Sequence, residues 1–209
     1  NENVQGDIMA LLPDIIFYSQ DNQLQDEITL GQLEGSNKRS TFRNLLKLAG
    51  IDKIETYIDK EMKEQLKKKK KIQRDITLNL NEYWDQKEVR LEIKDNEHGM
   101  SVFIQDVKKN NERVDRHPEL PSQRSKGFNW FLSFYINFKA ISENQDNSII
   151  LLDDPAVYLH PKGKQNWVDA IQEISEDNQV IYTAHSPYSI DKRHLGKARL
   201  AKDKGDSIS

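Results

Sequence analysis

Two adjacent carboxylates at the end of an apolar segment are the sharpest chemical feature of the sequence. Four apolar residues, Ile149 to Leu152, are followed directly by Asp153, Asp154 and Pro155. Burying a charge is costly unless it is paired or binds a cation, so this pattern favours a cation site. At the carboxyl end of a parallel strand the expected cation is Mg²⁺ carrying phosphates, with Asp153 holding the metal and Asp154 activating a water. A polar turn that only ends the strand is the alternative.

A histidine follows the next apolar segment. Residues 179–183 are the second apolar strand candidate, and His185 comes two positions later. Because neighbouring parallel strands end at one edge of a sheet, we expect His185 on the same edge as Asp153 and Asp154. There its imidazole could hydrogen-bond a terminal phosphate and the attacking water. A lone histidine is more often structural, but two strand ends that deliver acids and an imidazole to one edge favour function.

A polar segment before an aromatic helix is the third feature. Ser125 and Gly127 stand at the start of a helix predicted over residues 127–140. The first backbone N–H groups of a helix have no internal partner and lie at the positive end of its dipole, so they indicate an anion site. Arg124 and Lys126 add positive charge. An ordinary capped helix that packs in the core is the alternative.

The elements that must position these residues predict an α/β fold. Apolar strands at 148–152 and 179–183, separated by a helix over 162–175, predict a parallel βαβ unit with both faces covered. A short β-branched and aromatic run predicts another buried strand at 15–18, and a last strand is expected near Ala198.

The middle of the chain is predicted to form helices followed by a β-hairpin. Thr41 is the predicted N-cap of a short helix, and residues 52–86 hold no glycine or proline and predict helices with one apolar face. Alternation at 89–93 and 102–107 around a turn predicts a β-hairpin. The run Lys67 to Lys71 fits either a solvated helix face or a contact with nucleic-acid phosphates.

Composition excludes several classes of function. The 209 residues include no cysteine, which excludes disulfides, thiolate zinc sites and a cysteine nucleophile. No apolar run is long enough to span a membrane, and a cytoplasmic protein is the expectation. A net charge of −3 does not favour a protein that coats nucleic acid, so any such contact must be local.

Three segments taken together, in this order, resemble the OLD-like (overcoming lysogenisation defect) ATPases. Residues 121–134 (PSQRSKGFNWFLSF) resemble the stretch at the ABC signature position of that family. Residues 151–161 (LLDDPAVYLHP) resemble its Walker B and D-loop, and residues 179–187 (QVIYTAHSP) resemble its switch-histidine segment. The resemblance implies an ABC-type head of the P-loop NTPase class, related to the SMC and RecF-like ATPases. Such a head has a parallel sheet core with helices, an inserted helical arm and a β-hairpin.

The resemblance also implies a division of the chain and a set of ligands. Residues 1–40 would be a strand and loop of the head, 41–86 the helical arm, and 87–209 the lobe with the three motifs. ATP and Mg²⁺ would be the cofactors, bound between two heads of a homodimer. DNA and an associated nuclease are the further partners it suggests, in repair or phage defence, although nothing after His185 resembles a Toprim nuclease domain.

The resemblance assigns roles to individual residues. Asp153 would bind Mg²⁺, Asp154 would replace the catalytic glutamate, and His185 would be the switch histidine. Ser125 and Gly127, with Arg124 nearby, would touch the γ-phosphate held by the opposite subunit.

Two departures from the family pattern limit what can be expected. The family usually has glutamate where this chain has Asp154, and one methylene less withdraws the carboxylate by about 1.5 Å, which predicts slow hydrolysis. A P-loop, Gly-x-x-x-x-Gly-Lys-Ser/Thr, is absent, because Gly196-Lys197 is followed by Ala198. The chain is therefore expected to be the carboxyl-terminal part of a head, inactive alone. A non-enzymatic scaffold with a degenerate head is the alternative.

Overall fold

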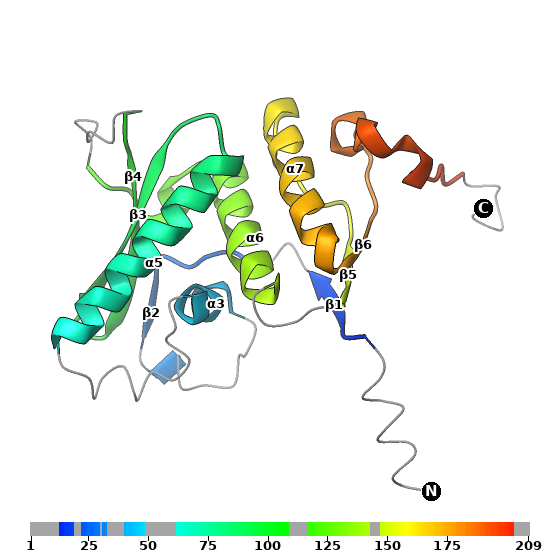
Figure 1. Cartoon of the computed structure of the whole chain (residues 1–209). Helices are drawn as coiled ribbons and strands as arrows, with labels where there is room; N and C mark the ends of the chain where they lie inside the picture. The colour runs from blue at the N-terminus through cyan, green and yellow to red at the C-terminus, as the bar shows by residue number, and fades with distance from the viewer. Residues whose placement is uncertain are drawn as a thin grey trace, which may run out of the picture.

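The described part of the chain contains two small sheets, four α-helices and three short 3₁₀ helices (Figure 1). The computed structural model describes residues 13–18, 22–29, 31–32, 40–48, 62–108, 117–142 and 147–202. Ile54 and Ile58 of the predicted helical zone lie outside these ranges. None of the described helices has the length and apolarity needed to cross a bilayer.

The first sheet is parallel and has the strand order β1-β5-β6. Its strands are β1 (Ile15–Tyr18), β5 (Ile149–Leu152) and β6 (Gln179–Tyr182). The connection from β5 to β6 runs through α7 (Pro161–Asp177), so the predicted βαβ unit is present. The register aligns the last residues of the three strands, and all three therefore end at one edge.

Aromatic packing holds two helices against one face of this sheet. Helix α6 (Lys126–Ser142) contributes Phe138, whose ring centroid lies 5.2 Å from that of Tyr18 on β1. Helix α7 contributes Trp167, which meets Tyr182 of β6 edge to face with centroids 5.0 Å apart. Such large buried rings supply most of the apolar area in this layer and fix where the strands lie beneath the helices.

The opposite face of the parallel sheet is open. Alternate residues of a strand point to opposite faces, and Ile15, Phe17 and Ile181 are 65%, 58% and 52% exposed. The expectation of helices on both faces is therefore wrong for the described residues. The reason is geometric, since α6 and α7 both lie on the same side of the strands (Figure 1).

The second sheet is antiparallel, with the order β2-β4-β3. The predicted hairpin is confirmed as β3 (Val89–Asn96) and β4 (Gly99–Asp106). A third strand, β2 (Glu27–Thr29), was not predicted, because three residues with one apolar centre give too weak an alternation. Gly99 permits its approach, since a Cβ there would lie 1.9 Å from the carbonyl oxygen of Ile28.

Helix α5 (Met62–Tyr83) packs on this second sheet, and helix α3 (Thr41–Leu48) packs on α6. Helix α3 begins one residue earlier than predicted, because the cap is Ser40, whose hydroxyl accepts a hydrogen bond from the backbone N–H of Arg43. Thr41 instead donates its hydroxyl to the carbonyl of Asn22. Helix α5 lies along β3 and contacts it through polar side chains, among them Thr77, which accepts from the N–H of Leu91.

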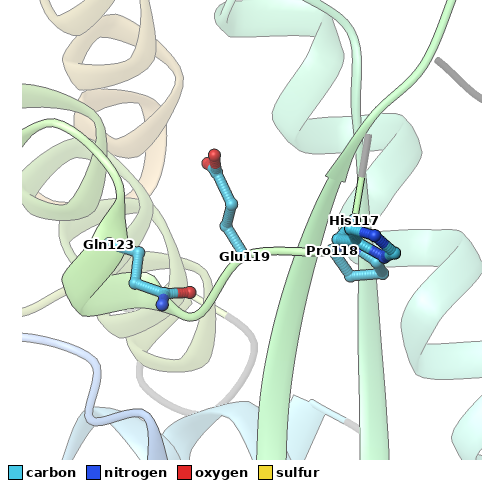
Figure 2. A pocket seen from close by; sticks show the side chains of 4 residues that line it. All are labelled: His117, Pro118, Glu119 and Gln123. Carbon is cyan, nitrogen blue, oxygen red and sulfur yellow. The ribbon is translucent and has the colours of Figure 1, made fainter. Parts of the chain in front are cut away.

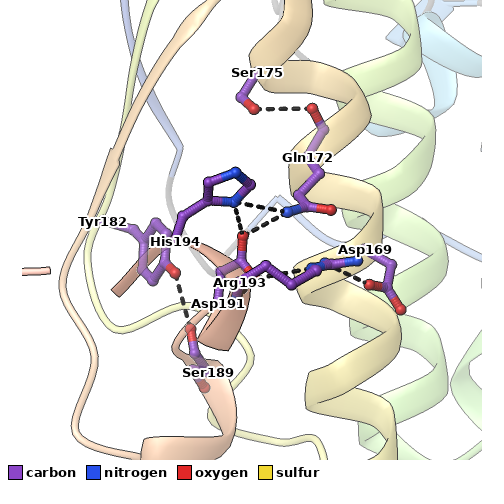
Figure 3. A network of polar contacts seen from close by, with 8 residues as sticks. All are labelled: Asp169, Gln172, Ser175, Tyr182, Ser189, Asp191, Arg193 and His194. Carbon is purple, nitrogen blue, oxygen red and sulfur yellow. Dashed lines mark hydrogen bonds and ion pairs between the residues drawn. The ribbon is translucent and has the colours of Figure 1, made fainter. Parts of the chain in front are cut away.

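The chain after β6 folds back onto α7. Two short 3₁₀ helices follow, at Pro187–Ser189 and Lys192–Lys197, and residues 198–202 form no strand, so the strand expected near Ala198 is absent from the described residues. Asp191 joins this segment to α7 by accepting from Gln172, and it pairs with His194 within the segment itself (Figure 3). Burial raises the pKa of Asp191, but hydrogen bonds from His194 and Arg193 outweigh it and hold that pKa well below its ordinary value.

Candidate functional site

The carboxyl ends of β5 and β6 are joined by one threonine. The hydroxyl of Thr183, directly after β6, donates to Oδ1 of Asp153 at 2.8 Å. The hydroxyl oxygen of Thr183 also accepts from the backbone N–H of Asp154 at 2.7 Å, and the N–H of Thr183 donates to the carbonyl of Leu152 at 3.0 Å. Three hydrogen bonds therefore connect the two strand ends, and the predicted shared edge is present.

The turn after β5 is unusual in its backbone. Asp154 has a φ of 39° and Ala156 a φ of 61°, a left-handed conformation that non-glycine residues rarely adopt. Such a conformation persists only where the surroundings enforce it. Here the N–H of Asp154 is fixed by Thr183, and the side chains of Pro155 and Ala156 are buried beneath the turn. The two carboxylates therefore leave the strand end in a defined direction.

His185 stands at the same edge. It follows Thr183 by two residues, and its side chain is exposed. No hydrogen bond or ion pair joins its imidazole to another of the described residues, in contrast to His194. The structure thus places His185 beyond the end of β6 with ring nitrogens available to a ligand.

The start of α6 is the third predicted segment. The hydroxyl of Ser125 accepts a hydrogen bond from the N–H of Phe128 at 3.2 Å, so Ser125 caps this helix. The N–H groups of Lys126 and Gly127 have no partner among the described residues. A helix start with free N–H groups can bind an anion, as the sequence predicts.

Gly127 brings the start of α6 against the turn that follows β5. A Cβ at this position would lie 2.8 Å from the carbonyl oxygen of Tyr158 and 3.3 Å from the side chain of Leu159. Only glycine allows this approach without a shift of the backbone. The signature-like segment and the Asp153-Asp154 turn are therefore neighbours through residues 158–159.

Arg124 is engaged within the fold. Its guanidinium donates to Asp106 at 2.7 Å and to Glu119 at 2.8 Å, and it lies over the ring of Phe128 at 4.9 Å. Burial raises the pKa of Asp106. The hydrogen bonds from Arg124 and Lys87 lower it by more than burial raises it, so the pKa lies below its ordinary value. A phosphate contact by Arg124 would require the guanidinium to give up one of these carboxylates.

An open pocket of about 450 Å³ lies beside this ion cluster (Figure 2). Its described lining consists of His117, Pro118, Glu119 and Gln123. Glu119 is paired with Arg124, and Gln123 accepts a hydrogen bond from the N–H of Leu120. None of the residues predicted to carry the chemistry is in this described lining, so the pocket is separate from the β5–β6 edge.

The AAA ATPase domain family matches residues 7–190 of the chain, which includes all three motif segments. The chain belongs to this family. It is an ATPase domain of the α/β class, with a parallel sheet, helices and the predicted hairpin.

This AAA ATPase domain is also similar to a curated protein of undescribed function. It is 34% identical over 125 residues to the uncharacterized protein MJECL43 of Methanocaldococcus jannaschii. The match covers 58% of this chain and 32% of that protein, so the chain spans about a third of the length of this relative.

Two solved structures show a partial likeness to the ATPase domain. The Smc head bound to the C-winged helix domain of ScpA gives a TM-score of 0.46 at 16% identity, over 71% of this chain and 43% of that one. An Smc head domain with an extended coiled coil, bound to the C-terminal domain of ScpA derived from Pyrococcus furiosus, gives 0.38 at 14% identity, over 77% and 46%.

The edge of the ATPase domain suits Mg²⁺ by the chemistry of its donors. Mg²⁺ prefers oxygen ligands and is usually held by one or two carboxylates, with water and substrate phosphates completing its shell. The carboxylates of Asp153 and Asp154 meet this demand, and Thr183 orients the first of them. No group of three or more His, Asp or Glu side chains that could hold a metal by itself occurs in the described ranges.

Thr183 is the residue of the ATPase domain that sequence reasoning missed. It was assigned only to the end of an apolar strand, although its hydroxyl joins the two motif segments. The available signal was a hydroxyl-bearing residue directly after the strand and two positions before His185. A β-branched residue also has a high strand propensity, which hides this second role.

Proposed function

We propose that the chain is the part of an ABC-type ATPase head that carries the Walker B and switch-histidine segments of an OLD-like protein. The proposed reaction is ATP binding followed by slow, Mg²⁺-dependent hydrolysis between two heads. One observation carries this proposal above all, namely that Thr183 hydrogen-bonds both Asp153 and Asp154 across the ends of β5 and β6. This arrangement places the acidic pair and the strand that leads to His185 at one edge.

The proposed roles at this edge follow from reach and donor type. Asp153 would hold Mg²⁺, which neutralises phosphate charge when bound. Asp154 would accept the proton of the attacking water, and the exposed imidazole of His185 would hydrogen-bond the terminal phosphate. A general base must lie within about 3 Å of its proton, and an aspartate is shorter than a glutamate by one methylene, about 1.5 Å. Hydrolysis would therefore be slow while binding is retained.

The start of α6 would bind the γ-phosphate held by the opposite subunit. The hydroxyl of Ser125 accepts from Phe128 and still has its own proton to donate, and the N–H groups of Lys126 and Gly127 are free among the described residues. These groups suit an anion. Arg124, paired with two carboxylates, would position this segment and add positive charge to it.

A second lobe with a P-loop would complete the site. The sequence contains no Gly-x-x-x-x-Gly-Lys-Ser/Thr, and such a loop supplies most of the affinity for phosphates. The open sheet face at Ile15, Phe17 and Ile181 offers apolar surface on which such a lobe would pack. We therefore propose that residues 1–209 alone do not hydrolyse ATP. The coupling to DNA, in repair or phage defence, and an associated nuclease rest on the resemblance.

Turnover of the full-length protein tests the role of Asp154. Asp154→Glu is expected to raise the rate of phosphate release at saturating ATP by at least about tenfold, because it restores the reach of the base. Asp154→Asn is expected to lower that rate by about 10² or more. Asp177→Asn, which removes an equal charge at the exposed end of α7, is the matched control and should leave the rate unchanged.

Two results would count against the proposal. If Asp154→Glu does not exceed the parent rate, the geometric argument about the base is wrong. If neither the parent protein nor Asp154→Glu binds or hydrolyses ATP, the degenerate scaffold replaces the ATPase as the function.

A further inference from the structure

The outer face of α5 carries a line of positive charge. Lys67, Lys70, Lys71 and Arg74 are all exposed. An α-helix turns by about 100° per residue, so positions 67, 71 and 74 lie within about 60° of one another around the helix axis. We call Lys67, Lys70, Lys71 and Arg74 the α5 basic stripe.

The stripe lies opposite the buried apolar side of α5. Ile76 and Leu80, on the other side of the helix, are 4% and 0% exposed. Thr77 and Asn81 hydrogen-bond the backbone of β3, which fixes the rotation of the helix about its own axis. Figure 1 shows α5 on the outside of the molecule, along the hairpin. The fold thus holds the stripe toward solvent.

The four charges of the stripe are not neutralised by ion pairs with other described residues. None of its four residues forms an ion pair with another described residue, whereas Lys87, Lys94 and Lys162 each contact a carboxylate. Exposed acids are near, namely Asp75 on the flank of α5 and Asp95 and Glu97 at the hairpin turn. By helical position Asp75 lies about 40° beyond Lys71, so it adjoins one edge of the stripe but does not lie between its cations.

The spacing of the stripe suits a phosphate backbone. Each helical residue rises 1.5 Å, so the distance along the axis from Lys67 to Arg74 is about 10.5 Å. One strand of duplex DNA advances about 3.4 Å per phosphate, so this length matches about three phosphates. A bilayer surface is less well matched, because Leu78 is the one large exposed apolar side chain on the described part of α5 and gives little to insert.

We infer that the α5 basic stripe binds the phosphate backbone of nucleic acid independently of base sequence. This inference deepens the part of the proposed function that concerns DNA, and it does not depend on the nucleotide site. A net charge of −3 for the whole chain is compatible with such a local contact, because salt screens exposed charges beyond about 10 Å.

Fluorescence anisotropy with a labelled DNA duplex of about 30 base pairs tests the inference on the full-length protein. Each phosphate contact contributes about −0.9 to the slope of log K against log salt. The variant Lys67→Gln, Lys71→Gln, Arg74→Gln is expected to bind at least about tenfold more weakly at low salt. Its slope should be smaller in magnitude by about 2.7, which corresponds to three lost contacts.

A charge-matched control separates the stripe from general electrostatics. Lys164→Gln, Lys192→Gln, Lys197→Gln removes the same charge from α7 and the segment after β6, and its affinity should change by less than about twofold. All of the substituted side chains are at least partly exposed, so melting temperatures should stay near that of the parent protein. ATP turnover without DNA should also be unchanged in the stripe variant, which keeps this test separate from that of Asp154.

Three outcomes would overturn the inference. The first is an unchanged salt slope in the stripe variant. The second is an equal loss in the control variant. The third is binding of the parent protein to vesicles of phosphatidylserine and phosphatidylcholine, with the same dependence on the stripe, but not to the duplex.

Discussion

The start of α6 and the edge of β5 and β6 both resemble ATPase motifs, yet they use their polar groups differently. At the start of α6, Arg124 is enclosed by Asp106 and Glu119, and the Ser125 hydroxyl caps the helix. At the β5–β6 edge, Asp153 is exposed and His185 has no partner among the described residues. The first region is built into the fold, and the second faces outward.

This difference separates stability from chemistry. A charge enclosed by partners contributes to folding, because removing one partner leaves the others buried and uncompensated. An exposed imidazole contributes little to folding, so its presence at a strand end is better explained by a ligand. Stability measurements should therefore distinguish the two regions before any substrate is added.

The largest expected effect is at Arg124. Arg124→Met keeps an apolar side chain over Phe128 but removes the charge between Asp106 and Glu119. We expect the free energy of unfolding to fall by about 3 kcal/mol, at the lower end for a broken buried pair because Lys87 still contacts Asp106. Denaturant unfolding measures this. The double variant with Asp106→Leu should recover part of the loss, and a further loss would show that Arg124 acts by packing alone.

The pH dependence of that loss is a second prediction. The pKa of Asp106 is below its ordinary value in the fold, so its contribution to stability is complete above the unfolded pKa of about 3.9 and is lost as pH falls through the folded value. Without Arg124, burial raises this pKa, and protonation then relieves a buried charge. The stability difference between parent and Arg124→Met should therefore shrink from about pH 7 to about pH 4. A constant difference would contradict the assigned role of the ion pair.

The sequence predicts those features of the two regions that neighbouring residues determine, and not those that depend on packing between distant elements. Strands of four apolar residues ending in Asp153 or leading to His185 were predicted within a residue or two, because burial and charge change abruptly there. The ion pair of Arg124 with Asp106 could not be predicted, since it joins residues from different elements whose packing is a tertiary property. The open sheet face could not be predicted for the same reason, whereas strand β2 is too short to give a clear alternation.

Thr183 holds the β5–β6 edge together. Thr183→Val preserves shape but removes both hydrogen bonds to the turn, and we expect a loss of about 0.5–1.5 kcal/mol in the free energy of unfolding. Thr183→Ser keeps the hydroxyl and should recover most of it. In the full-length protein, Thr183→Val should also raise the Mg²⁺ concentration needed for half-maximal turnover, because Asp153 loses its orientation. An unchanged Mg²⁺ dependence, with stability alone reduced, would confine Thr183 to the fold.

His185 should give the smallest change in stability. His185→Ala removes a side chain that is exposed and has no partner among the described residues, so the free energy of unfolding should change by less than about 0.5 kcal/mol. His194→Ala is the matched control, because His194 pairs with Asp191 at 2.7 Å and its removal should lower the melting temperature measurably. In the full-length protein the order should reverse, with ATP turnover reduced by His185→Ala and spared by His194→Ala. If His185→Ala destabilises the fold as much as His194→Ala does and leaves turnover intact, the outward-facing edge is structural, and the contrast between the two regions no longer marks the site of chemistry.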